Sequence, residues 1–129
     1  MAHALYALGR VALAALFIWS GWGKLVAPEG LSMMLAGRGL PMPLYLAYAA
    51  GLAEIVLGAL VVIGWQARLA AVGLIAFTVA ATYLAHDFWT QTGATARANQ
   101  IHAMKNLAVI GGLLMLAAGG PGRFALGRR

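Results

Sequence analysis

The chain contains no cysteine and few charged residues, and both shortages restrict what it can be. Without cysteine it has no disulfide, no thiolate metal or iron–sulfur site and no dithiol chemistry. Any redox role must therefore use a bound small molecule or a partner subunit. Only 9% of its 129 residues are charged, whereas a soluble domain uses roughly 25% to cover its surface. We therefore expect one membrane-embedded domain spanning residues 1–129.

Acidic residues are the scarcest charges, with three Asp and Glu against nine Lys and Arg. In a soluble protein the resulting net charge of +6 would suggest nucleic acid as a partner. In a membrane protein, Lys and Arg lie at helix ends and face anionic lipid instead. We therefore expect membrane lipid as a partner and no nucleic acid.

Apolar residues make up 63% of the chain and fall into four stretches. Windows of about 20 residues, enough to cross roughly 30 Å of hydrocarbon, lie near residues 5–25, 44–64, 67–86 and 102–119. The first is expected to be an uncleaved span, because no basic stretch precedes it and no good cleavage site follows it. The predicted fold is an all-α integral membrane protein, a four-transmembrane-helix bundle.

The connections between the spans also carry information. The loop after the first span is long enough for a short surface helix around residues 30–37, and residues 90–100 are expected to form a polar loop. Four spans place both termini on one side of the membrane. That side holds more Lys and Arg, including Arg128 and Arg129 in the tail, so the positive-inside rule predicts cytoplasmic termini.

Glu54 lies near the middle of its span, where an ionisable residue is costly and marks a functional site. The other residues on its helical stripe are small, which lets transmembrane helices approach closely: Ala47, Gly51 and Gly58. A stripe on the first span carries a cation near each end: Arg10, Phe17, Gly21 and Lys24. We expect Glu54 to contact Lys24 or Lys105–Asn106 across the bundle. The alternatives are a Glu54 contact that only fixes packing, and cations that snorkel to the headgroups.

Polar and aromatic residues of the spans meet at the side opposite the termini. Lined up at this level are Trp19, Ser20, Trp22, Lys24, His86, Phe88, Lys105 and Asn106. Together with Glu54 they predict an outward-facing polar pocket in which Glu54 and His86 are catalytic proton-transfer groups and the others bind a ligand. The aromatic residues alternatively form an interfacial belt. His86 and His102 have the matching depth of haem ligands, but a haem at the mouth of a bundle is unusual, so neither haem nor a metal is expected.

The motifs Ser20-Gly21-x-x-Lys24, Glu54-x-x-x-Gly58, and His86-x-Phe88-Trp89 before Lys105-Asn106 resemble the DoxX family. The resemblance covers nearly the whole chain. It implies a small four-helix protein of the bacterial inner membrane. The family takes its name from a membrane subunit associated with terminal quinol oxidase and thiosulfate–quinone chemistry, so the resemblance also implies a link to quinone.

Two classes of function follow from these residues. The first is a membrane subunit of a redox system, a quinone-linked oxidoreductase subunit, whose aromatic residues form a slot for quinone or quinol and whose polar residues donate hydrogen bonds and relay protons. The second is non-catalytic: a membrane anchor or assembly subunit for a partner redox subunit, or a small-solute carrier coupled through Glu54. A homo-oligomer is compatible with both classes.

Overall fold

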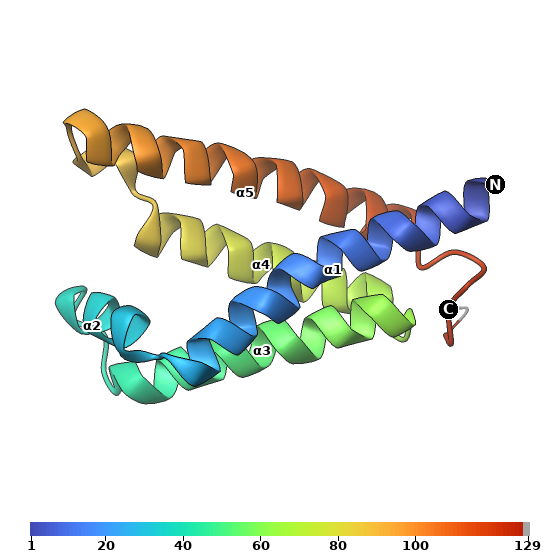
Figure 1. Cartoon of the computed structure of the whole chain (residues 1–129), viewed down its shortest axis with the longest axis horizontal. Coiled ribbons are helices and arrows are strands. Elements are labelled where there is room, and N and C mark those ends of the chain that lie inside the picture. The colour runs from blue at the N-terminus through green and yellow to red at the C-terminus, as the bar shows by residue number, and fades with distance from the viewer. Residues whose placement is uncertain (128–129) are drawn as a thin grey trace.

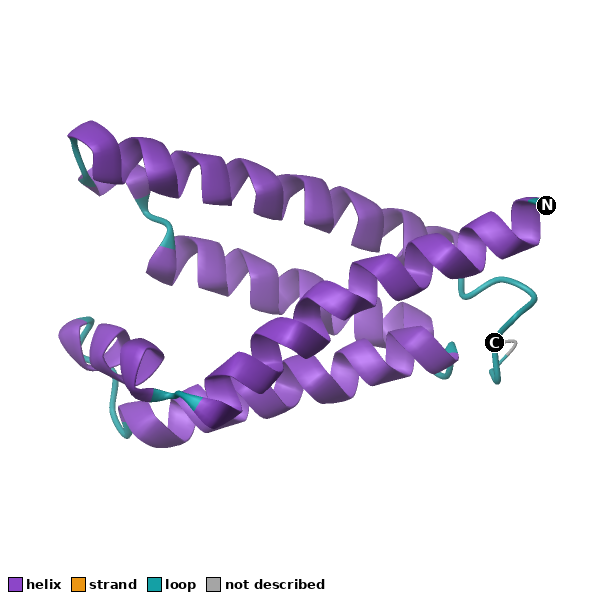
Figure 2. Ribbon diagram, in the orientation of Figure 1, coloured by secondary structure: helices purple, strands orange, loops and turns teal. Residues whose placement is uncertain are grey.

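The computed structural model describes residues 1–127, and every regular element in this part of the chain is a helix. The elements are α1 (Ala2–Val26), α2 (Glu29–Gly37), α3 (Pro43–Ile63), α4 (Ala67–Ala85), the short 3-10 helix η1 (Phe88–Thr90) and α5 (Gly93–Gly119). Figure 2 shows that loops and turns alone connect them. Four segments are long and apolar enough to cross a membrane: α1, α3, α4 continued through η1, and α5. The predicted four-span fold is confirmed, as is the short helix after the first span. Arg128 and Arg129, which contribute to the topology prediction, lie outside the described residues.

Proline and glycine set the ends of α3. Pro43 is its first residue, a position where the fixed φ of proline suits a helix and the missing N–H has no partner to lose. Gly64 follows its last turn with a φ of 75°, a left-handed conformation that favours glycine. The chain therefore reverses its direction between α3 and α4, and the two helices form a tight hairpin.

Helix α5 begins well before the predicted span near residue 102, so the expected polar loop over residues 90–100 is wrong. Alanines at positions 94, 96 and 98 favour helix here. In this first part of α5, Asn99 contacts His86 and Gln91, whereas Thr95, Arg97 and Gln100 are exposed. The polar composition therefore belongs to a largely exposed helix end rather than to an irregular loop.

The helices form two pairs that meet at one end. α1 packs along α3 and α4 packs along α5, while the α3–α4 hairpin joins the pairs. Figure 1 shows the pairs close together near the two termini, here called the closed end, and apart where α2 lies, here called the open end. The apolar core consists of Ala14, Phe17, Val61, Ala70, Ala71, Leu74, Leu113 and Leu116. These residues hold the pairs together between the middle of the bundle and the closed end.

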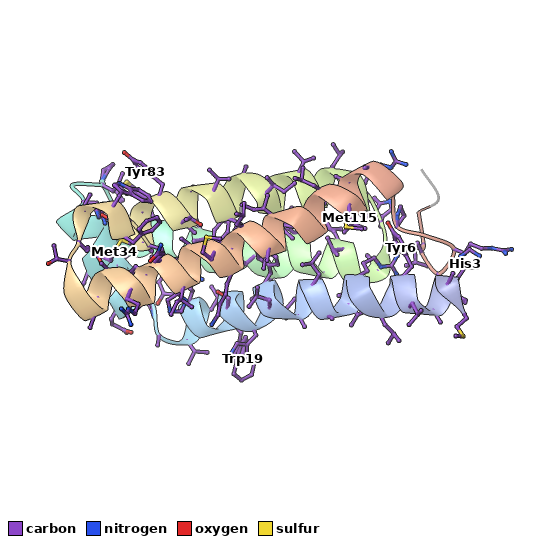
Figure 3. The ribbon with its side chains drawn as sticks, turned by 90° about the horizontal axis from the view of Figure 1, so that it is seen from above. His3, Tyr6, Trp19, Met34, Tyr83 and Met115 are labelled. Carbon is purple, nitrogen blue, oxygen red and sulfur yellow. The ribbon has the colours of Figure 1, made fainter. Side chains whose placement is uncertain are left out.

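The outside of the bundle is apolar, as expected for a surface in contact with lipid. Large hydrophobic side chains are exposed along every membrane-spanning helix, among them Leu8, Leu52, Leu69 and Leu107. Trp19 is 80% exposed and projects away from the bundle (Figure 3). Since a soluble protein rarely exposes so much continuous apolar surface, lipid is the natural surrounding of these faces.

Candidate functional site

Two glycines bring α1 and α3 into backbone contact. A Cβ atom on Gly21 would lie 2.5 Å from the Gly51 carbonyl oxygen, and one on Gly51 would lie 2.8 Å from the Gly21 carbonyl oxygen. A larger residue at either position would therefore push the helices apart. The small-residue stripe predicted for α3 is buried throughout, as expected. Its effect is to place Glu54, about one turn after Gly51, against the end of α1.

Glu54 forms an ion pair with Lys24 across this interface. Lys24 Nζ lies 2.7 Å from Glu54 Oε2 and donates a 2.6 Å hydrogen bond to Ser20 Oγ. The Glu54 side chain is 4% exposed and the Lys24 side chain 23% exposed, so the pair is largely removed from solvent. The predicted contact between Glu54 and Lys24 is confirmed. Lys24 thus turns into the bundle instead of snorkelling to the headgroups.

The Lys24 ammonium is shared between two partners. It lies beside the buried Glu54 Oε2 and donates to Ser20 Oγ. An ammonium has three N–H donors, so one remains for a further acceptor such as water or a ligand. Lys24 Nζ also lies 5.9 Å from the centre of the Phe77 ring, within cation–π range. The charged pair therefore has capacity for one more polar partner.

The ion pair lies in the wall of a cavity of about 460 Å³ in the open half of the bundle. Six polar side chains line it: Ser20, Lys24, Glu54, Thr78, His86 and Asn106. The rest of the wall is apolar and includes the rings of Phe17 and Phe77, with Leu31, Met34 and Leu35 contributed by α2. An apolar cavity with a few converging polar groups is typical of a small-molecule site.

A hydrogen bond from α5 to α4, continued by a second one within α4, fixes one side of this cavity. Asn106 Nδ2 donates to Thr82 Oγ1 at 2.8 Å, and Thr82 Oγ1 donates in turn to the Thr78 carbonyl at 2.7 Å. Because hydrogen bonds are directional, these two bonds hold the Asn106 amide group at the cavity wall.

His86 stands at the mouth of the cavity with a defined tautomer. Its Nδ1 donates to Asn99 Oδ1 at 3.0 Å, because Asn99 uses its amide nitrogen to donate to Gln91 Oε1. This bond leaves His86 Nε2 free of Asn99, as the ring nitrogen available to another partner. The ring stacks on His102 with centroids 4.8 Å apart and planes 17° apart. Rings stacked face to face do not point at a shared iron from opposite sides, so this pair does not have the geometry of haem ligands.

A second ion pair, which was not predicted, lies at the open end of the bundle. Arg38, just after α2, lies 2.8 Å from Asp87 Oδ2, next to η1. Thr90 and Gln91 donate hydrogen bonds to the same carboxylate. The sequence holds a signal for this cluster, since Asp87 is one of only three acids and Thr90 follows at the spacing of a turn. The cluster ties α2, which lines the cavity, to the end of α4.

Four of the predicted ligand-binding residues do not line the cavity. Trp19 and Trp22 are 80% and 61% exposed, Lys105 is exposed, and Phe88 packs edge-on against Trp89 in η1. The prediction that these tryptophans and Phe88 form an aromatic slot is wrong, because both tryptophans are exposed on α1 and the half-buried Phe88 packs against Trp89 without lining the cavity. Phe17 and Phe77 provide the aromatic wall instead. Ser20, Lys24, Glu54, His86 and Asn106 are brought together as predicted.

Comparison with known proteins agrees with this architecture. The DoxX family model matches residues 5–87. "Inner membrane protein YphA" of Escherichia coli is 34% identical over 95% of this chain and 87% of its own length. "Inner membrane protein YqjF" of the same organism is 29% identical over 94% of this chain and 88% of its own length. No solved structure gives a significant match.

These relatives and the four apolar helices identify a multi-pass protein of the bacterial inner membrane. The family match runs from the start of α1 to the end of α4, and it includes Ser20, Lys24, Glu54 and His86. The chain therefore belongs to the DoxX family.

Proposed function

We propose that the chain is a membrane subunit of a redox system and binds quinone or quinol in the cavity beside Glu54. One observation carries the proposal: the buried Glu54–Lys24 ion pair lies in the wall of a cavity that is otherwise mainly apolar. A ligand that suits this wall is small, largely apolar and soluble in lipid, and has a polar head that exchanges hydrogen bonds. Quinones and quinols have these properties, and both reach a membrane site from the bilayer.

The chemistry of the lining residues fits such a head group. The Lys24 ammonium is a donor for a carbonyl oxygen, and the Asn106 amide and Ser20 hydroxyl lie in the same wall. Phe17 and Phe77 offer ring faces for a planar ligand. The volume of about 460 Å³ falls within the range of roughly 300–1,000 Å³ that small-molecule sites occupy.

The quinone–quinol couple would supply two electrons and two protons to the site when bound. The Glu54 carboxylate and the His86 imidazole are the two groups of the wall suited to accept protons. Asn99 orients His86 through its Nδ1, so the other nitrogen is available to another partner. Electrons would pass to a partner redox subunit, because the chain has no cysteine to form a thiol–disulfide couple.

Photolabelling with an azido-quinone tests this proposal on the purified protein in lipid nanodiscs. We expect label in peptides from the second half of α1 and the first half of α3, and competition by unmodified quinone. Lys24→Ala should lower labelling at least several-fold, which corresponds to about 1 kcal/mol of binding energy. The matched control is Lys105→Ala, because Lys105 is exposed at the same end and does not line the cavity.

A second pair of variants separates ligand loss from unfolding. Ala81→Leu fills part of the cavity and leaves the ion pair intact, whereas Ala76→Leu adds the same volume on the exposed face of α4. Only the first should reduce labelling. Equal labelling of all variants, or label confined to the lipid-facing side of α1, would contradict quinone binding and favour the anchor or assembly function.

A further inference from the structure

The segment after α5 folds back over the closed end of the bundle and is held by α1 and α3. Arg10 donates to the carbonyl oxygens of Pro121 and Phe124, and Tyr6 Oη donates to the Gly120 carbonyl at 2.7 Å. The Leu126 amide donates to the Ile63 carbonyl at 3.0 Å. The guanidinium of Arg10 is buried, so it is not a snorkelling helix end, and it fixes a glycine-rich loop, residues 119–122, above the membrane-spanning helices.

Positive charge at the closed end has no acidic partner among residues 1–127. Glu54 is paired with Lys24 and Asp87 with Arg38, and Glu29 begins α2 at the open end. These are the three acidic side chains of the chain. Arg10 is occupied by backbone carbonyls, whereas Arg68 and Arg123 are exposed and their guanidinium groups are accessible to an anion.

A pocket of about 310 Å³ collects these groups beside the glycine-rich loop. His3, Arg68 and Arg123 line it together with Gly119, Gly120 and Gly122. The Arg68 guanidinium lies against the loop, since a Cβ on Gly120 would be 3.1 Å from its Nε and Nη2. The Pro121 carbonyl points at Arg10, so in the trans peptide the N–H of Gly122 points away from it. Guanidinium groups beside a glycine loop are suited to bind phosphate.

An apolar groove lies along the seam between α1 and α5, at the same end of the bundle as this pocket. It has a volume of about 240 Å³ and is lined by Leu5, Tyr6, Gly9, Leu13, Gly112 and Met115 among others. Tyr6 lies between the two spaces, because its side chain lines the groove and its hydroxyl donates to the Gly120 carbonyl of the loop. Figure 3 shows Tyr6 and Met115 in this region, near the loop that follows α5.

We propose that this composite site binds an anionic phospholipid from the leaflet on the side of the termini. The phosphate contacts Arg68, Arg123 and the glycine loop, and an acyl chain lies in the groove between α1 and α5. Free phosphate shares the chemistry of the head group, but it has no apolar part that would occupy the groove. Basic pockets between transmembrane helices on the cytoplasmic side recognise lipid head groups in this manner.

Native mass spectrometry of the purified chain with phosphatidylglycerol and phosphatidylcholine tests the proposal. We expect phosphatidylglycerol to be retained preferentially, and Arg68→Gln/Arg123→Gln to lower its retention roughly tenfold or more, at about 1 kcal/mol per arginine near a charged surface. The matched control is Arg97→Gln/Lys105→Gln, which removes two exposed charges at the open end and should change nothing.

Filling the groove distinguishes lipid from free phosphate. Gly9 has no atom within 4 Å of an added Cβ, so Gly9→Leu is compatible with the helix while it fills the groove. It should lower phosphatidylglycerol retention and leave titration with inorganic phosphate unchanged. Equal retention of the two lipids, equal loss in the two double variants, or phosphate binding without lipid preference would each overturn the proposal. Circular dichroism of every variant shows whether the helices are intact.

Discussion

Removing the positive partner of Glu54 should destabilise the bundle more than removing the negative one. Lys24→Met keeps the aliphatic part of the side chain but leaves a carboxylate that is 4% exposed without its ammonium. Losing one partner of a buried pair costs about 3–5 kcal/mol. Glu54→Gln instead removes the buried charge, and Lys24, which is 23% exposed, keeps its hydrogen bond to Ser20. For that variant we expect a loss of about 1–2 kcal/mol.

Unfolding in mixed micelles by titration with a denaturing detergent, followed by circular dichroism, measures these differences. The double variant Lys24→Met/Glu54→Gln should recover most of the stability that Lys24→Met loses, because no unpaired charge is left. Comparing the single and double variants isolates the energy of the pair. Lys105→Met is the control, and as an exposed substitution it should stay within about 0.5 kcal/mol of the wild type.

The reasoning fails if Lys24→Met unfolds at the same detergent fraction as Lys105→Met. It also fails if the effects of Lys24→Met and Glu54→Gln are additive in the double variant, since additivity means that the two groups do not interact. Either result would show that Glu54 finds its polar partner elsewhere, and that the 2.7 Å contact contributes little to stability.

Two further predictions concern the frame around the site. Gly51→Leu should cost at least about 1–3 kcal/mol of stability by overpacking the α1–α3 contact, measured in the same unfolding assay, whereas Gly111→Leu should be tolerated because no atom lies within 4 Å of an added Cβ. Similar stability for the two variants would contradict the close helix approach. Reporter domains fused after Gln91 and at the C-terminus should report opposite sides of the membrane, the second cytoplasmic, and a shared side would contradict the four-span topology.

Helical periodicity alone was enough to predict the centre of the site. The stripe of Ala47, Gly51 and Gly58 showed that Glu54 faces a packed helix and not lipid. Few cations lie within reach of a carboxylate at that depth, so the predicted partners were Lys24 or Lys105–Asn106, and the structure shows Lys24. These inferences succeed because a small residue pattern and a buried charge each allow few arrangements in a bilayer.

Other features depended on contacts that periodicity does not encode. Trp19 and Ser20 are neighbours in sequence, and only the packing of α1 on α3 decides that Ser20 turns inward while Trp19 faces outward. Arg38 and Asp87 meet through two connections that are distant in sequence. Arg10 binds carbonyl oxygens of the C-terminal segment, and backbone acceptors carry no sequence signature. Tertiary structure therefore had to supply these partners.

Substitutions are expected to cost different amounts of stability in the two halves of this bundle. Leu74 and Leu113 are fully buried in the core that joins the helix pairs, where truncation to alanine costs about 2–5 kcal/mol. The residues that shape the cavity, such as Ala81 and Met34, lie in the other half of the bundle and on α2. Substitutions at Ala81 or Met34 are therefore expected to alter the size and polarity of the ligand space while leaving Leu74 and Leu113 in place. Phe17 and the Lys24–Glu54 pair, in contrast, serve both the cavity and the packing. The ligand space of this bundle is thus adjustable at a few positions on α2 and α4 that the core does not use.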